Sequence, residues 1–312
     1  MIALSQSLPP PHRSPFNAHW LDQVRKTKPD FVLLGNSMVQ TRFDEPTLRK
    51  LLHLRPVSVL GLIGTASSGW YLALKNVIVA SDYHPRVLLF FREQELTEPR
   101  KWTHGSKGRH RVEQLSLAEE PLLARKLAPP PSEPIELLSW WRERLMPFER
   151  LHERSDLLVD FAGKSLSRLA YRKADERTRM RRINELFALG NLRSTDAASE
   201  PAVVPEPQVF GSVVAGSFLP DMLELAAANQ IPLTFVRVRT RPAAAGVPKT
   251  RGEQRYDADL ERYVRAHGAE FYDMHDTAWE TLDMYAEGDH ISSRLTRKYT
   301  ELFVEHMGQI FH

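Results

Sequence analysis

Three short apolar runs recur at similar spacing in the first third of the chain, and this feature constrains the fold more than any other. They occupy residues 31–34, 57–60 and 86–91, and the stretches between them, 46–54 and 67–80, have helical character. Short apolar runs bounded by turn residues are typical of strands that are buried on both faces. Strands that alternate with helices predict a parallel sheet, joined by right-handed crossovers and covered on both faces by helices.

The same alternation returns towards the C-terminus. Helical patterns at 219–229 and 255–267 alternate with strand patterns at 232–239 and 269–273, and 295–311 has the spacing of an amphipathic helix. We therefore expect an α/β fold whose sheet combines strands from both ends of the chain.

The middle of the chain has a different character. It is rich in arginine and polar residues, and its helical patterns fall at 113–126, 135–145, 151–169 and 176–189, with a proline cluster at 129–134 and a flexible connection predicted at 194–207. We interpret 97–207 as an inserted helical subdomain. The α/β core is then expected from 29–96 and 208–312, and 1–28 is expected to be an N-terminal extension.

Composition excludes several classes of chemistry. The chain has 312 residues with 42% hydrophobic content, enough to bury a substantial core, and it has no cysteine. Disulfides, thiolate metal sites and thiol nucleophiles are therefore excluded. The formal charge of +3 arises from many charges of both signs, so no nucleic-acid partner is predicted, and the basic stretch at 177–182 is interpreted as a solvated helix face.

Other segments bear on whether the chain has a membrane anchor, a metal site or a cofactor. Residues 1–13 hold three prolines and no long apolar stretch, which predicts neither a signal peptide nor a membrane anchor. The chain is expected to be soluble as given, either cytoplasmic or, where an anchor or signal is missing, periplasmic. The histidines and aspartate at His104, His110, His275 and Asp276 do not form a metal-ligand spacing, so we predict no metal and no cofactor.

Two short segments at opposite ends of the chain carry the strongest functional signal. Residues 31–37 form an apolar run that ends in a glycine turn at Ser37, and residues 287–290 place His290 beside the carboxylates of Glu287 and Asp289. A serine hydroxyl becomes a strong nucleophile when a base removes its proton and an acid orients that base. These residue types therefore predict the parts of a serine hydrolase.

Each of these residues also has an ordinary structural interpretation. Ser37 is a favoured residue for capping a helix, His290 alone is typical of a surface histidine, and a glycine at 64 is consistent with a turn of positive φ. Trp140 and Trp141 in the insertion suit packing better than sugar stacking. The occurrence of the serine, the histidine and the carboxylates in one chain favours the catalytic interpretation.

In these segments the chain resembles the SGNH hydrolase superfamily, also called GDSL-type esterases. Gly35-Asn36-Ser37 resembles the family's Gly-Asp-Ser block, with Asn36 in place of an aspartate that is not a triad member. Gly64, or less well Gly61, matches the glycine of the second block, and Gln94 stands where the family has an asparagine. Glu287 lies at the family's spacing of three residues before the histidine, whereas Asp289 lies directly before it.

The resemblance covers about 30–96 and 209–312 and implies a flavodoxin-like three-layer α/β/α sandwich with a large helical insertion. It also implies an acyl-serine intermediate, an oxyanion hole made by Ser37, Gly64 and Gln94, and an ester substrate, either a small molecule or an acylated carbohydrate. Arg92 is a candidate for substrate binding. Residues 217–220 and 285–291 are similar to bacterial proteins tied to polysaccharide or cell-envelope acylation.

Several alternatives stay open at this point. Either Glu287 or Asp289 can orient the histidine, with the spacing favouring Glu287, and either water or a sugar hydroxyl can accept the acyl group. Asn36 and Gln94 depart from the family, which leaves a catalytically degenerate glycan-binding or scaffolding protein as a second reading. A third is that the arginine-rich insertion binds an anionic partner. The sequence predicts no oligomeric state.

Overall fold

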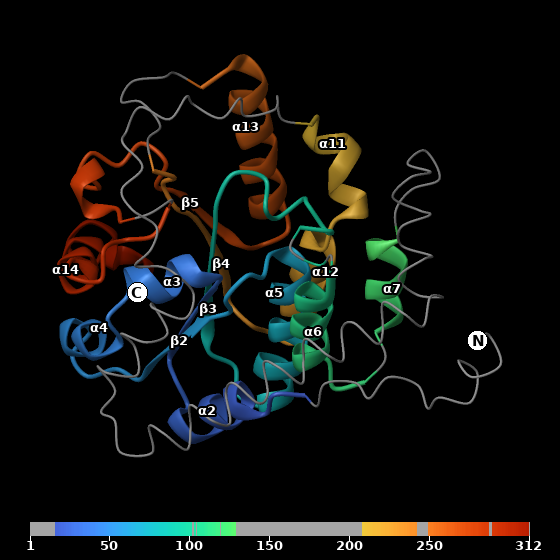
Figure 1. Ribbon diagram of the computed structural model, residues 1–312, viewed down its shortest axis with the longest axis horizontal. Coiled ribbons are helices and arrows are strands. Elements are labelled where there is room, and N and C mark those ends of the chain that lie inside the picture. The colour runs from blue at the N-terminus through green and yellow to red at the C-terminus, as the bar shows by residue number, and fades with distance from the viewer. Residues whose placement is uncertain are drawn as a thin grey trace. The chain divides into compact units, whose positions relative to one another are not determined.

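The computed structural model describes residues 16–101, 103, 105–118, 120–128, 208–241, 249–286 and 289–311 (Figure 1). Most of the predicted insertion falls outside these residues, including the helices expected at 135–145, 151–169 and 176–189, the tract at 194–207, the tryptophans at 140 and 141, and the basic stretch at 177–182. The N-terminal residues 1–13, His104 and Glu287 also lie outside them.

Five parallel strands form the central sheet, as the sequence predicts. They are β1 (Phe31–Gly35), β2 (Val57–Gly61), β3 (Arg86–Phe91), β4 (Leu233–Arg237) and β5 (Glu270–Asp273), in the order β2-β1-β3-β4-β5. This order is that of flavodoxin-like doubly wound folds. Because β1 lies between β2 and β3, the first apolar run of the chain forms an interior strand of the sheet.

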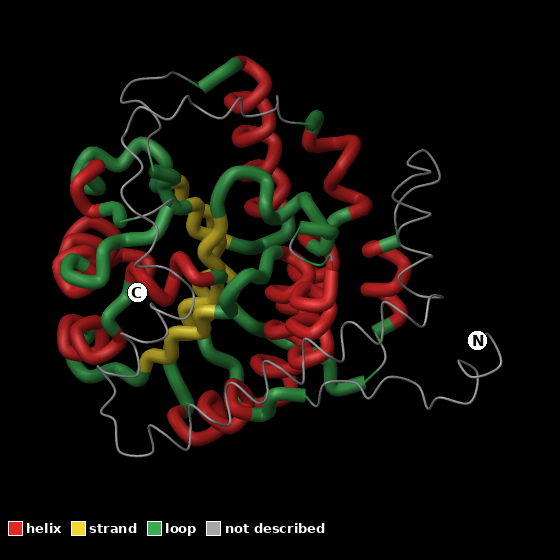
Figure 2. Tube along the Cα trace, in the orientation of Figure 1, coloured by secondary structure: helices red, strands yellow, loops and turns green. Residues whose placement is uncertain are grey.

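Helices cover both faces of the sheet, so the protein is a three-layer α/β structure (Figures 1 and 2). Phe31 and Leu33 of β1 point into one layer, whereas Val32 and Leu34 point into the other, because successive side chains of a strand face opposite ways. The first layer contains α3 (Ser37–Arg42), α4 (Glu45–Leu51) and α14 (Thr296–Met307). The second contains α2 (His19–Thr27), α5 (Ser67–Ala73), α12 (Leu219–Ala228) and α13 (Arg251–Ala266).

Some helix boundaries differ from the predicted ones because a proline or a capping pair sets where the helix begins. The predicted helix at 113–126 is wrong, because the structure has two helices there, α6 (Gly105–Leu115) and α7 (Pro121–Leu127). Proline has no N–H to donate and a fixed φ that suits the first turn of a helix, so Pro121 begins a new helix. Helix α13 begins four residues before the predicted 255, because Thr250 and Glu253 form a reciprocal capping box.

Segments outside the predicted core also pack onto the sheet. Helix α2 lies within the segment expected to be an N-terminal extension, yet its Leu21 and Val24 are buried against the second layer. Residues 16–127 belong to the same compact unit as the sheet, so this unit includes α6 and α7 as well. The apolar face of α2 gives the physical reason, since its burial is favourable only against the core.

The described residues contain no single helix that is long and apolar enough to cross a membrane. Phe210–Gly216, which includes α11 (Phe210–Val213), and Leu219–Ala228 meet the length and composition criteria only as a pair, and the two are bent by 59°. Leu219, Met222 and Leu223 of the second segment are buried in the core.

Candidate functional site

The candidate site lies at the carboxyl ends of β1 and β3. The strand order reverses between these two strands, and doubly wound folds bind their ligands in the crevice outside such a reversal. Ser37 follows β1, and Arg92 follows β3 directly. Asp289 and His290 come from the segment between the 3-10 turn Leu282–Met284 and α14, far along the chain.

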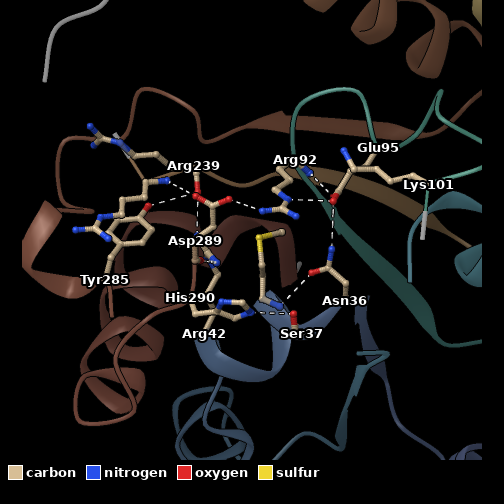
Figure 3. Close-up of polar contacts among 12 residues, drawn as sticks. Asn36, Ser37, Arg42, Arg92, Glu95, Lys101, Arg239, Tyr285, Asp289 and His290 are labelled. Carbon is tan, nitrogen blue, oxygen red and sulfur yellow. Dashed lines mark hydrogen bonds and ion pairs between the residues drawn. The ribbon is translucent and has the colours of Figure 1, made fainter. Parts of the chain in front are cut away.

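Ser37 and His290 lie within hydrogen-bonding distance. Ser37 Oγ is 2.9 Å from His290 Nε2, although 253 positions separate the two residues (Figure 3). The helix-capping interpretation of Ser37 is wrong, because the side chain of Asn36 caps α3 by accepting from the Met38 N–H at 3.0 Å. The hydroxyl of Ser37 therefore faces the imidazole.

Gly35 allows α3 to begin directly at the end of β1. A Cβ atom at this position would lie 2.3 Å from Val39 Cγ2 and 3.1 Å from the carbonyl oxygen of Phe90. Neither atom is free to move, because Val39 is fully buried and the Phe90 carbonyl belongs to β3. The glycine of the sequence motif is thus required by close packing, and this packing sets the position of Ser37 at the strand end.

Asp289 holds the segment next to His290 in place. Its carboxylate accepts from the Arg241 N–H at 2.6 Å and forms an ion pair with Arg92, and its backbone carbonyl accepts from Arg42 Nη1 at 2.8 Å. The backbone carbonyl of His290 accepts from the Ala286 N–H at 2.9 Å. Both oxygens of the Asp289 carboxylate therefore have cationic or backbone donors as partners.

Arg92 and Glu95 bridge the two loops that carry Ser37 and His290. Arg92 Nε donates to Glu95 at 3.0 Å, the Arg92 N–H donates to the same carboxylate at 3.2 Å, and the amide of Asn36 approaches its two oxygens at 3.4 and 3.5 Å (Figure 3). The residue before Ser37 and the residue before His290 are thus connected through one Arg–Glu pair, in which Glu95 is buried and Arg92 is half-buried. The substrate-binding role of Arg92 stays a prediction.

Burial makes Glu95 sensitive to pH. Desolvation raises the pKa of its carboxyl above the ordinary 4.5, and the charge of Arg92 offsets only part of that effect. Between 4.5 and the raised pKa the folded protein binds more protons than the unfolded chain, so stability falls as pH rises through this window.

We therefore expect Glu95→Gln to gain stability relative to the wild type as pH rises above 4.5, because glutamine carries no charge to desolvate. Urea unfolding of both proteins from about pH 4 to about pH 8 measures this. Glu93→Gln is the matched control, since Glu93 lies in the same turn and is exposed. Parallel stability curves for wild type and Glu95→Gln would contradict the expectation.

A second charge pair, between Arg42 and Glu280, lies next to the segment that carries His290, because Arg42 donates to the Asp289 carbonyl. The side chains of Arg42 and Glu280 are fully buried, and Arg42 Nη2 lies 3.0 Å from Glu280 Oε1. Tyr285 donates its hydroxyl to Glu280 at 2.6 Å, and Arg42 Nε donates to the Tyr299 hydroxyl at 3.2 Å. Burial, followed by the charge of Glu280, raises the pKa of Tyr285 and Tyr299, so both hydroxyls stay protonated.

The residues predicted to form an oxyanion hole follow three neighbouring strands: Ser37 begins α3 after β1, Gly64 lies in the loop after β2, and Gln94 lies in the turn after β3. Gly64 has a φ of +65°, which favours glycine, and among the described residues no hydrogen bond uses the N–H of Ser37 or of Gly64. Gly61 ends β2 and packs against Gln40 of α3. Gln94 is half-buried in the turn after β3, and its backbone carbonyl accepts from the Thr97 N–H at 2.8 Å.

Sequence reasoning missed four charged residues around this site: Glu95, Arg42, Glu280 and Arg111. A signal existed only for Glu95, since an arginine and a glutamate three residues apart follow a buried strand. Glu287, which spacing favours as the triad acid, is outside the described residues, so its role stays a prediction. Across the described ranges, no group of three or more His, Asp or Glu side chains is placed to hold a metal ion.

Comparison with known proteins adds no assignment. No protein-family model matches the chain, and no curated protein matches it.

Proposed function

We propose that this protein is a serine hydrolase that cleaves ester bonds through an acyl-serine intermediate. The observation that carries the proposal is the 2.9 Å distance between Ser37 Oγ and His290 Nε2 at the carboxyl end of the central strands. This distance lies within the range for a nucleophile and its general base. The resemblance of the surrounding segments to SGNH hydrolases supports the same assignment, with an acylated carbohydrate or a small ester as substrate.

The first half of the proposed reaction forms the acyl-enzyme. His290 Nε2 accepts the hydroxyl proton as Ser37 Oγ attacks the ester carbonyl, and the carbonyl oxygen becomes a tetrahedral oxyanion. The N–H groups of Ser37 and Gly64 are the proposed donors to that oxygen, with the amide of Gln94 as a third. When the tetrahedral species collapses, the C–O bond to the alcohol breaks, and His290 gives its proton to the departing oxygen.

The second half releases the acyl group. Water, or a sugar hydroxyl in the case of transfer, loses its proton to His290 and attacks the acyl-serine carbonyl. A second tetrahedral species forms and collapses, and Ser37 recovers its proton from His290. The free acid or the new ester leaves, and the enzyme returns to its starting state.

The proposal is tested with a fluorophosphonate probe, which loses fluoride and bonds covalently to an activated serine. We expect the wild-type protein to be labelled, with the added mass mapped by mass spectrometry to the peptide that contains Ser37, and Ser37→Ala to remain unlabelled. Heat-denatured protein should not react, because activation requires the folded Ser37–His290 pair.

Ser212→Ala is the matched control for this experiment. Ser212 is exposed, and its hydroxyl donates to the Val209 carbonyl at 2.7 Å, so labelling should be unchanged. Absence of labelling in the wild type, alongside normal labelling of a known serine hydrolase, would reject the proposal and favour the binding-module alternative suggested by Asn36 and Gln94.

A second experiment identifies the acid that orients His290. We expect Glu287→Gln to lower kcat for an activated acetate ester by about 10³-fold to 10⁴-fold, as loss of a triad carboxylate does. Asp289→Asn should cost at most about 100-fold, because the Asp289 carboxylate binds Arg92 and Arg241 and its loss shifts the loop rather than the proton chemistry.

Steady-state kinetics of the two variants, with unfolding midpoints as a check on folding, decide between them. A larger loss in Asp289→Asn would assign the acid role to Asp289. Equal losses of about tenfold or less would contradict a triad carboxylate at either position.

A further inference from the structure

Arg111 lies against the glycine that is proposed to bind the oxyanion. It belongs to α6, and its Nη1 donates to the Gly64 carbonyl at 3.0 Å. The guanidinium occupies the space that a side chain at position 64 would need, since a Cβ atom there would lie 2.2 Å from Nη1 and 2.4 Å from Cζ of Arg111. The positive φ of Gly64 favours glycine at this position, and any side chain there would displace the guanidinium of Arg111.

This contact brings Arg111 close to the site around Ser37. The Leu62 N–H donates to the Gly35 carbonyl at 2.8 Å. The loops after β1 and β2 therefore begin side by side. Ser37 is two residues beyond Gly35, and Gly64 is two residues beyond Leu62. The guanidinium that covers Gly64 consequently lies at the carboxyl ends of the strands, as does the proposed nucleophile.

Arg111 is half-buried and has no carboxylate partner among the described residues, unlike Arg42, Arg92 and Arg237. Arg42 pairs with Glu280, Arg92 with Glu95 and Asp289, and Arg237 with Asp257 and Asp273. Among the described residues, the guanidinium of Arg111 makes one hydrogen bond, to a neutral carbonyl, whereas a guanidinium has five N–H donors. Burial without a counter-charge lowers the pKa of Arg111, and an anion beside it would offset that cost.

We propose that Arg111 binds an anionic group of the ester substrate, a carboxylate or a phosphate carried by its acyl or its alcohol part. The guanidinium fork matches either group by two parallel hydrogen bonds. Contact with Gly64 would then hold the charged group at a fixed distance from the proposed oxyanion donors. This inference rests on the proposed function and narrows its substrate class.

The test compares anionic and neutral esters of similar size. Mono(4-nitrophenyl) glutarate and 4-nitrophenyl valerate probe the acyl side, whereas 4-acetoxybenzoate and its methyl ester probe the alcohol side. We expect the wild type to prefer the anionic ester of at least one pair by about 10-fold to 100-fold in kcat/KM, the range for a hydrogen bond to a charged group. Arg111→Met should remove this preference, because it should lower kcat/KM for the anionic ester by about 10-fold to 100-fold more than for the neutral ester.

Two further variants separate recognition from structure. Arg111→Lys keeps the charge without the fork and should retain part of the preference. Arg25→Met is the matched control, because Arg25 also donates to a backbone carbonyl, that of Ala80 at 2.7 Å, and it should retain the full preference. No preference in the wild type, or an equal loss on neutral and anionic esters in Arg111→Met, would overturn the proposal.

Failure of the proposed function gives a different result from failure of this inference. If the wild type hydrolyses none of the four esters, binding of glutarate and 4-hydroxybenzoate is measured directly by calorimetry. Binding of either anion by the wild type that is lost in Arg111→Met supports an anion site without ester hydrolysis. Absence of binding, or equal binding by both proteins, overturns the inference.

Discussion

Replacing Ser37 by alanine, or His290 by glutamine, is expected to lower kcat for an activated acetate ester by on the order of 10⁴-fold to 10⁶-fold. The proposed reaction requires the hydroxyl and the imidazole together, because neither the nucleophile nor the base works without the other. The double variant should therefore be no slower than the worse single variant. Steady-state rates of the wild type and the three variants, each corrected for the uncatalysed reaction, measure the coupling.

His84→Gln is the matched control for His290→Gln. His84 is exposed and lies just before β3, at the amino end of that strand, whereas the site lies at the carboxyl ends. Its replacement should therefore leave kcat within about twofold of the wild type. Additive losses in the double variant would mean that Ser37 and His290 act separately. That result would contradict the mechanism even if each single variant were slow.

Replacing Arg42 by methionine is expected to lower the free energy of unfolding by about 3–5 kcal/mol. The change removes the charge partner of Glu280, whose side chain is fully buried beside it, and an unpaired buried carboxylate is costly. The double variant Arg42→Met/Glu280→Gln should recover part of the loss, since the uncompensated charge is then gone. Chemical denaturation of the three proteins measures these differences.

An exposed ion pair supplies the control for this prediction. Arg297 and Glu301 lie one turn apart on α14, with Nε 3.1 Å from Oε1 and with exposed side chains, so Arg297→Met should change the unfolding free energy by less than about 1 kcal/mol. An equally small effect of Arg42→Met would contradict the assigned role of the buried pair. Arg42→Met should also slow catalysis, because Arg42 donates to the Asp289 carbonyl beside His290.

The fold was predictable because strand and helix patterns are local. Residues 86–91 were predicted as a strand and form β3 with the same ends, and the other four strands agree within one or two residues. Continuous apolar runs indicate burial on both faces, and such burial requires covering helices. Short elements were less visible: α3 has six residues and was not predicted, and the helix predicted at 67–80 contains a π-helical turn at Leu74–Ile78.

The chemistry of single residues was also readable from the sequence. A serine after a glycine turn, and a histidine flanked by carboxylates, were identifiable because residue type and spacing depend only on the chain. Their partners were not identifiable in the same way. The sequence predicts that Arg92 binds substrate, but it gives no sign that Glu95 and Asp289 pair with Arg92. It gives no signal at all for Arg111.

By itself, the sequence determined the parallel α/β class, the glycine turn before Ser37 and the supply of a nucleophile, a base and acids. Only the tertiary structure decided that the Ser37 hydroxyl meets the His290 imidazole across 253 positions, that one Arg–Glu pair joins their loops, and that the Arg111 guanidinium covers Gly64. The physical reason is that the periodicity of side chains along a helix or a strand is set over a few residues. Pairing of buried charges, by contrast, depends on which strand ends the packed core brings together.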